Sequence, residues 1–320
     1  MSQARDFADS FSAVSTGRRN MLINGAFEVA QRSTSEVTGA GYTTVDRWRF
    51  PAAGQKTQQV TNDRDLSIPK MLKATSSSTG YGIINQRIED VTKTSGQTVT
   101  ASFWAKTSDF NDFRFYIYQK FGTSGSSDVT VIDDADYFTV SGSGWTQYTA
   151  TVTIPSVSGK TIGTGSSLDF GFGPNSGTDS GVVYYSEVQL EVGNSASPFE
   201  HRSYGEELAL CQRYCHIWKS GQTYDAICLM ATWSDNSSIY GTYTLPVEMR
   251  ADPTVTYSGS FEFAAKGNSA SGTTPTTNRI GRYIVQPRYN KASHGLGSGV
   301  AGWLRDSNDS DATITFDAEL

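Results

Sequence analysis

No stretch of this 320-residue chain approaches the roughly 20 consecutive apolar residues of a transmembrane helix, and the opening MSQARDFADS lacks the apolar core of a signal peptide. Basic residues are too few for a nucleic-acid-binding protein, because 26 Lys and Arg against 32 Asp and Glu leave a formal net charge of −6. We therefore expect neither membrane insertion nor a nucleic-acid partner.

Cysteine is scarce as well. The chain has three, Cys211, Cys215 and Cys228, which form neither a disulfide framework nor a CxxC metal pair. We expect three buried free thiols that act as small apolar side chains. This cysteine usage fits a protein that folds in a reducing cytoplasm.

Motifs of catalysis are missing too. None of the three histidines stands in a sequence context typical of a hydrolase or a metalloprotease. Glycan cleavage uses two carboxylates that face each other across a cleft. The clustered Asp133, Asp134 and Asp136 lie in a turn-like run, which we interpret as a solvated loop. We expect no enzyme, and a glycan-cleaving enzyme is the alternative.

Aromatic residues and glycine are abundant instead, at 12% and 31 residues, while only 18% of the chain is charged. Aromatic residues favour strands and glycine favours turns. Apolar and polar residues alternate in Thr98–Lys106, Phe113–Phe121 and Val182–Val192, with no long helical pattern between them. Residues 20–200 are predicted to form a jelly roll or β-sandwich whose first strand lies near Met21–Val29.

Residues 219–320 predict a second, smaller antiparallel β-domain. Its candidate strands are separated by connections rich in Gly, Asn and Asp. They are Tyr224–Trp233, Ser238–Val247, Pro253–Ser258, Phe261–Ala265, Arg282–Pro287, Gly299–Arg305 and Ala312–Ala318. The predicted fold class is therefore all-β, with one short α-helix linking the two domains.

The linking helix is predicted over residues 201–218. Ser203 and Glu206 form an S-x-x-E capping box at its start. Five side chains then recur at spacings of 4, 3, 4 and 3, which is heptad spacing. They are Tyr204, Leu208, Cys211, Cys215 and Trp218. This stripe packs either copies of the chain or the two domains against each other, and the pattern leaves both open.

Residues 1–19 are polar, but Ala4, Phe7, Ala8 and Phe11 recur at helical spacing. A helix this short is marginal alone, so its apolar side chains need a surface to pack on. Our hypothesis is an N-terminal arm that docks on a neighbouring protein, and a frayed tail is the alternative.

Several segments resemble tail-fibre and receptor-binding proteins of tailed phages, marine podoviruses especially. The most specific is the run Gln189–Gly193, Pro198–Glu200 and Tyr204–Tyr214. Further matches are Asn20–Arg32, Val45–Phe50, Leu245–Thr254 and Phe316–Leu320. The turn Asn24-Gly-Ala-Phe-Glu28 is also similar to one in carbohydrate-binding jelly-roll modules.

The resemblance implies a non-catalytic virion protein of the tail, made in the host cytoplasm and usually homotrimeric. It would bind a tail adaptor or nozzle protein through residues 1–19 and attach to a host surface glycan. Two alternatives remain open. One is a purely structural tail or capsid decoration protein, and the other is a tail spike that degrades surface polysaccharide.

A glycan platform is predicted on the outward face of two strands. Sugars stack their apolar faces on aromatic rings and direct their hydroxyls to polar side chains. The candidates are Trp104 on one strand, and Arg114, Tyr116 and Tyr118 on the next. They form one platform if the two strands are neighbours. The alternative is that a loop or another subunit covers these aromatic rings.

The resemblance to jelly-roll modules also implies one metal, a structural calcium between the Asn-Gly-x-Phe-Glu turn and the last strand. Glu28 and Glu187 occupy the matching positions. Calcium takes six to eight oxygen ligands. The last strand reads Ser186-Glu187 where the modules carry two acids, so the set is incomplete, and no cofactor at all is the alternative.

Overall fold

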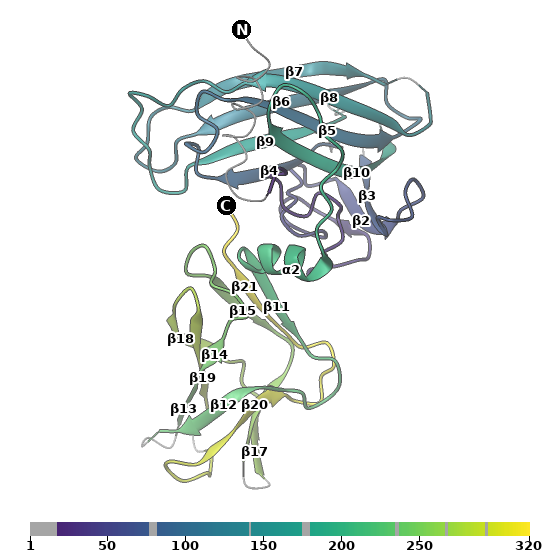
Figure 1. Cartoon of the computed structure of the whole chain (residues 1–320). Helices are drawn as coiled ribbons and strands as arrows, with labels where there is room; N and C mark the ends of the chain where they lie inside the picture. Colours follow the sequence, from purple (N-terminus) through teal and green to yellow (C-terminus); the bar gives the residue numbers. More distant parts are fainter. Residues whose placement is uncertain are drawn as a thin grey trace. The chain divides into compact units, whose positions relative to one another are not determined.

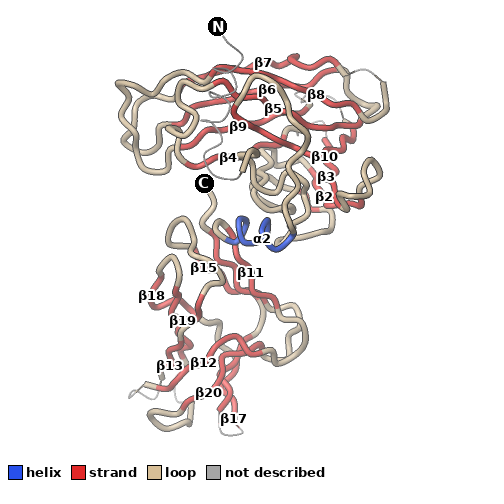
Figure 2. The backbone as a smooth tube through the Cα atoms, in the orientation of Figure 1, coloured by secondary structure: helices blue, strands red, loops and turns tan. Residues whose placement is uncertain are grey.

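The computed structural model describes residues 18–76, 82–140, 142–174, 180–233, 237–265, 268–291 and 294–320. The chain divides into two compact units, one reaching Glu207 and including Leu320, the other spanning Leu208–Glu319. Figure 1 and Figure 2 show that strands dominate both units. The predicted all-β class is confirmed. The hypothesis of a docking arm falls mainly on residues 1–17, which lie outside the described part.

The N-terminal unit is a β-sandwich of two antiparallel sheets, as predicted (Figure 1). The six-stranded sheet has the order β1-β2-β3-β10-β5-β8 and the four-stranded sheet the order β4-β9-β6-β7. The strands are β1 Val37–Thr38, β2 Lys56–Thr61, β3 Lys70–Ser76, β4 Ile84–Glu89, β5 Thr98–Lys106, β6 Asp112–Lys120, β7 Val129–Thr139, β8 Thr146–Thr153, β9 Ser167–Gly173 and β10 Gly181–Val192.

One aromatic core lies between these two sheets. Phe103 of β5 and Phe172 of β9 belong to different sheets, yet their rings stack with centroids 3.9 Å apart. Phe113 and Phe115 of β6 are buried in the same cluster. Buried rings of this size stabilise a fold through the large apolar area that they remove from water. The alternating apolar residues of the sequence therefore face this core.

The predicted first strand, Met21–Val29, is wrong. The segment has no strand assignment, because Asn24 and Phe27 take positive φ angles of 60° and 57°, which extended backbone does not allow. The segment nevertheless runs beside β10, because the Val188 N–H of that strand donates to the Gly25 carbonyl at 3.0 Å. The two ends of the unit therefore meet through backbone hydrogen bonds, although not through a strand pair.

The C-terminal unit contains a three-stranded sheet, β11-β21-β15, and an eight-stranded sheet, β14-β19-β13-β12-β20-β16-β17, in which β18 pairs with β19. It has its own apolar core. The strands are β11 Cys215–Lys219, β12 Ala226–Thr232, β13 Ser238–Gly241, β14 Tyr243–Thr244, β15 Thr254–Ser258, β16 Phe261–Ala265, β17 Asn268–Ser271, β18 Thr276–Ile280, β19 Ile284–Asn290, β20 Ala301–Asp306 and β21 Thr313–Asp317. The predicted antiparallel β-domain is confirmed, with more and shorter strands than expected.

The helix α2, Tyr204–Gln212, is shorter than predicted. The Glu206 N–H donates to the Ser203 hydroxyl at 3.3 Å, which confirms Ser203 as the N-cap. The Tyr214 N–H then bonds the Cys211 carbonyl, a tighter i−3 bond that ends the helix. No described helix has the length and apolar character needed to cross a membrane.

Cys215 and Trp218 lie on β11, so the predicted five-residue stripe on one helix is wrong. From Cys215 onward the backbone pairs with β21 and does not continue the helix. This ladder gives partners to backbone N–H and C=O groups that follow the end of the helix. His216, Ile217 and Trp218 are also poor helix formers. The three cysteines are free and buried, as predicted.

Candidate functional site

The outward face of the four-stranded sheet carries three of the predicted residues. Alternate side chains of β6 enter the core, so Arg114, Tyr116 and Tyr118 point to the other face, as their spacing predicts. These three contact one another. The Arg114 guanidinium lies 5.3 Å from the Tyr116 ring centroid, and the Tyr116 and Tyr118 rings are 5.1 Å apart.

Asp133 of β7 binds this row. Arg114 donates from Nε to one carboxylate oxygen at 2.7 Å and from Nη2 to the other at 2.8 Å, and the Tyr118 hydroxyl donates to the same carboxylate. Hydrogen bonding from Arg114 lowers the pKa of Asp133. The interpretation of this acidic run as a loop is wrong, because residues 133, 134 and 136 lie within β7, which pairs with β6.

Tyr116 supports the face from below. Its ring lies across Gly171 of β9, where an added Cβ would be 2.3 Å from the ring, and Asn85 donates to its hydroxyl at 2.9 Å. Only 7% of Tyr116 is exposed, and burial raises its pKa to about 12. The Arg114 guanidinium lies over the ring. Tyr116 therefore holds the row in place, and Tyr118 and Arg114 are the more accessible groups.

Three polar side chains on the same face escaped the sequence analysis. They are Asn85 and Arg87 of β4 and Asp169 of β9. Arg87 donates to Asp169 at 3.2 Å, and the Ser167 hydroxyl donates to the other Asp169 oxygen at 2.8 Å. The sequence pattern does indicate the direction of Asp169, because Leu168, Phe170 and Phe172 enter the core and the residue between them points outward. The sequence did not reveal that β4 pairs with β9 and that β9 pairs with β6.

Trp104 does not belong to this face. It lies on β5 in the six-stranded sheet, whereas β6 lies in the four-stranded sheet, so the expectation that the two strands are neighbours is wrong. The Arg64 guanidinium lies 4.4 Å from the Trp104 ring centroid. A guanidinium at this distance makes a cation–π contact and occupies the ring face that a sugar would need.

The residues at the predicted calcium position do not fit a calcium site. Arg64 forms an ion pair with Glu187, so that carboxylate already has a cation. Burial, and then the nearby Glu207, raise the pKa of Glu28. In the described ranges no group of three or more acidic, His or Cys residues is placed to hold a metal. A guanidinium stands where the resemblance implies a metal ion.

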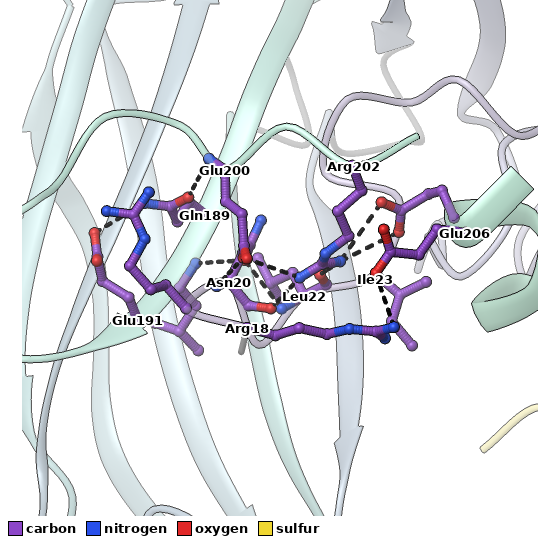
Figure 3. A network of polar contacts seen from close by, with 12 residues as sticks. Arg18, Asn20, Leu22, Ile23, Gln189, Glu191, Glu200, Arg202 and Glu206 are labelled. Carbon is purple, nitrogen blue, oxygen red and sulfur yellow. Dashed lines mark hydrogen bonds and ion pairs between the residues drawn. The ribbon is translucent and has the colours of Figure 1, made fainter. Parts of the chain in front are cut away.

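The segment after β10 is fastened to the start of the same unit by Arg202 (Figure 3). Its guanidinium donates to the Asn20 carbonyl and, at 3.0 Å, to the Leu22 carbonyl. It also contacts the carboxylates of Glu200 at 3.3 Å and Glu207 at 3.4 Å. The Arg202 side chain is 5% exposed. This buried network fastens the two ends of the unit to each other.

The helix that follows does not present its predicted apolar stripe as one buried face. Glu207 and Cys211 are its buried side chains, while Tyr204 is 55% exposed and Leu208 is partly exposed. Glu207 accepts a hydrogen bond from the Asn24 N–H, which explains the burial of a carboxylate there.

The β4-β9-β6-β7 face is suited to hydrogen bonding and not to proton transfer. Two carboxylates of this face, Asp133 and Asp169, are each held by an arginine. A glycan-cleaving acid needs a raised pKa, whereas the pKa of Asp133 is lowered. The face presents partly exposed guanidinium, carboxylate and phenol groups in fixed positions, which hydroxyl-rich ligands can bind.

Comparisons with known proteins give distant structural similarity only. No family model matches the chain, and no curated protein matches it. About half of the chain is similar to the CBM22-2 xylan-binding domain of Paenibacillus barcinonensis Xyn10C (18% identity, 50% of this chain, 100% of that chain, TM-score 0.33). It is also similar to a CBM4 module (17% identity, 53% and 98%, TM-score 0.33).

A further similar structure is a Stig cyclase, Fisc, from Fischerella sp. TAU (11% identity, 56% of this chain, 100% of that chain, TM-score 0.38). Similarity of this degree does not identify a ligand or an activity for this chain.

Proposed function

We propose that this protein is a non-catalytic attachment protein of a phage virion, a short tail fibre or receptor-binding protein. Its N-terminal unit binds a host surface glycan on the outward face of β4, β9, β6 and β7. The observation that carries the glycan part is the row Arg114–Asp133–Tyr118. It fixes a fork of donors, a carboxylate and an aromatic ring on one partly exposed face.

The rigidity of this row supports a binding role. Arg114 uses two nitrogens on one carboxylate, a geometry that fixes both side chains. Tyr116 fills the space above Gly171 and keeps Arg114 raised from the sheet. A face held in this way loses little conformational entropy when a ligand binds. The pairing of Asp133 and Asp169 with arginine favours binding over cleavage.

The virion part of the proposal is supported by the sequence resemblance at Gln189–Gly193 and Tyr204–Tyr214. It includes a location in the tail, synthesis in the host cytoplasm, attachment through residues 1–19 to an adaptor or nozzle protein, and a homotrimer. We do not assign the trimer contact to the predicted helix stripe, because α2 ends at Gln212 and the stripe is not one helical face. A purely structural decoration protein is the competing role.

A glycan array tests the binding face. The full chain is applied to neutral and acidic oligosaccharides, and we expect Tyr118→Ala and Arg114→Ala to weaken binding about tenfold each, since one aromatic or charge-assisted contact is lost. Thr149→Ala, exposed on β8 of the other sheet, is the control. Unchanged affinity in both variants would contradict the assignment of this face.

Two measurements test the virion part. Electron microscopy of particles labelled with an antibody to this chain should show label on the tail, and label on the capsid would favour a decoration protein. Sedimentation equilibrium should give three times the chain mass, and a stable monomer would exclude the homotrimer.

A further inference from the structure

In the C-terminal unit, strands β17, β16 and β20 gather polar and aromatic side chains on their outward face. Alternate residues of these strands enter the core. The residues between them face away, and the register places Glu262 of β16 between Arg305 of β20 and Ser271 of β17. The next row places Ala264 beside Trp303. We call this face, which runs from Ser307 just after β20 to Trp303 within it, the β20 strip.

The centre of the β20 strip is an ion pair. Arg305 donates from Nε to Glu262 Oε1 at 2.8 Å, and its Nη2 lies 2.6 Å from the same oxygen. The Ser307 hydroxyl donates to Glu262 Oε2 at 3.2 Å. The guanidinium also lies 4.7 Å from the Tyr224 ring centroid. The Glu262 carboxylate is buried, so the pair presents mainly the partly exposed Arg305 guanidinium, and the two opposite charges cancel.

A hollow of about 300 Å³ adjoins the ion pair. Its wall is rich in hydroxyl groups, and its described lining has no charged side chain. The lining residues are Gly259, Ser260, Phe261, Ser271, Gly272, Thr273, Thr274 and Ser307. Ser271 pairs with Glu262 across the strands, and the Ser307 hydroxyl bonds the Glu262 carboxylate, so the hollow adjoins the same face. Its volume is at the small end of ligand pockets.

Trp303 lies at the other end of the β20 strip and is 49% exposed. Its neighbours on the adjacent strands are Ala264 and Leu229, and Ala301 precedes it on the same face. The alanines are too small to cover the indole. From Ser307 to Trp303 the strip runs four residues, about 14 Å at a strand rise of ~3.4 Å per residue. It therefore extends beyond the hollow itself.

We propose that the β20 strip is a second glycan-binding site, which takes a neutral oligosaccharide. Hydroxyls of the ligand bond to the hollow and to the Arg305–Glu262 pair, and an apolar sugar face stacks on Trp303. The cancelled charges select a neutral glycan over an anionic one. The site extends the proposed glycan recognition but uses other residues in the other unit.

The chemistry of the β20 strip favours a saccharide over a second copy of the chain. The centre of a protein interface is depleted in charged residues and rich in large apolar ones. Here the centre is an ion pair and one end is lined by Ser and Thr hydroxyls, while the large exposed apolar side chains, Trp303 and Leu229, lie at the other end. Self-association is therefore an outcome to be tested and not the proposal.

The test uses the full chain on an array of neutral and uronic-acid-containing oligosaccharides. We expect Trp303→Ala to weaken binding to neutral members about tenfold, equivalent to about 1.4 kcal/mol. Thr274→Trp, which places a large ring at a lining position of the hollow, should do the same. Ser298→Trp, at an exposed turn outside the strip, is the control. The melting temperature of each variant checks folding.

The Tyr118→Ala variant separates this site from the first. Neutral oligosaccharide binding that survives Tyr118→Ala and is lost in Trp303→Ala supports the β20 strip. Binding lost only in Tyr118→Ala overturns this inference and leaves the proposed function standing. Absence of binding to every oligosaccharide overturns both. A Trp303→Ala variant that keeps its affinity but sediments at a lower mass shows a contact between copies, which also overturns the inference.

Discussion

The buried arginine that fastens the N-terminal unit gives the sharpest prediction for stability. Replacing Arg202 by Met keeps most of the side-chain volume but removes the guanidinium that bonds two backbone carbonyls and two carboxylates. The carboxylates of Glu200 and Glu207 are then left in a site where Arg202 itself is only 5% exposed. Breaking a buried ion pair from one side costs about 3–5 kcal/mol.

Solvent screening reduces this cost only slightly, because the side chains of Glu200 and Glu207 are 16% and 10% exposed. We therefore expect a loss of about 3 kcal/mol for Arg202→Met. For a unit of this size, each 1 kcal/mol lowers the melting temperature by roughly 2–4 °C, so the shift is roughly 6–12 °C. Differential scanning calorimetry measures it, with the C-terminal unit and its separate core as internal reference.

Arg18 provides a matched control in the same region (Figure 3). It pairs with Glu206 at 2.8 Å, but the two side chains are 45% and 41% exposed. Water screens such a pair, so Arg18→Met should change stability by less than about 1 kcal/mol. An equal loss of stability in Arg202→Met and Arg18→Met would show that the buried network contributes no more than an exposed ion pair. The double variant Arg202→Met/Glu207→Gln should lose less stability than the sum of the losses in the two single variants, because both residues belong to one network.

Three further predictions follow from single contacts. Gly171→Ala should cost about 1–3 kcal/mol and weaken glycan binding, because the new methyl group collides with Tyr116. Gly205→Ala on the exposed start of α2, where a methyl meets nothing, should not destabilise, and equal melting temperatures for both variants would contradict the argument. His216 is held neutral, since burial lowers its pKa to about 4 from an ordinary 6.5. The stability that depends on neutral His216 is complete above about pH 6.5. The free energy of unfolding then falls by about 3 kcal/mol as the pH is lowered from 6.5 toward 4. Calorimetry of wild type and His216→Phe between pH 7 and 4.5 should show a shallower dependence in the variant, and parallel curves would exclude the group. Chelator should leave the melting temperature unchanged, because Arg64 pairs with Glu187, and a drop that calcium reverses would restore the calcium site.

The alternation of residues predicted the orientation of side chains better than it predicted their neighbours. Arg114, Tyr116 and Tyr118 face outward as expected, because period 2 places alternate residues of one strand on opposite faces. Trp104 obeys the same rule, yet it faces outward on a different sheet. Which strands pair depends on contacts between residues far apart in the chain, and a local pattern does not contain them.

The same limit explains the errors at the acidic run and at the helix. Three aspartates within four residues favour a turn locally, but pairing with β6 and the Arg114 partner of Asp133 hold them in a strand. Ser203 was readable as a cap because capping is local. The end of α2 was not, since pairing of β11 with β21 joins residues about 100 positions apart and overrides the helical spacing.

The sequence by itself determined the all-β class, the separation into two β-domains, the outward row on β6, the cap of the linking helix and the three buried thiols. Each of these depends on residue type and short-range spacing. The tertiary structure alone decided that Arg64 covers Trp104, that Asp133 and Asp169 are neutralised by arginines, and that the hollow, the ion pair and Trp303 form one strip. These depend on register between distant strands, because the contacts that make a site are long-range while the patterns that make a strand are local.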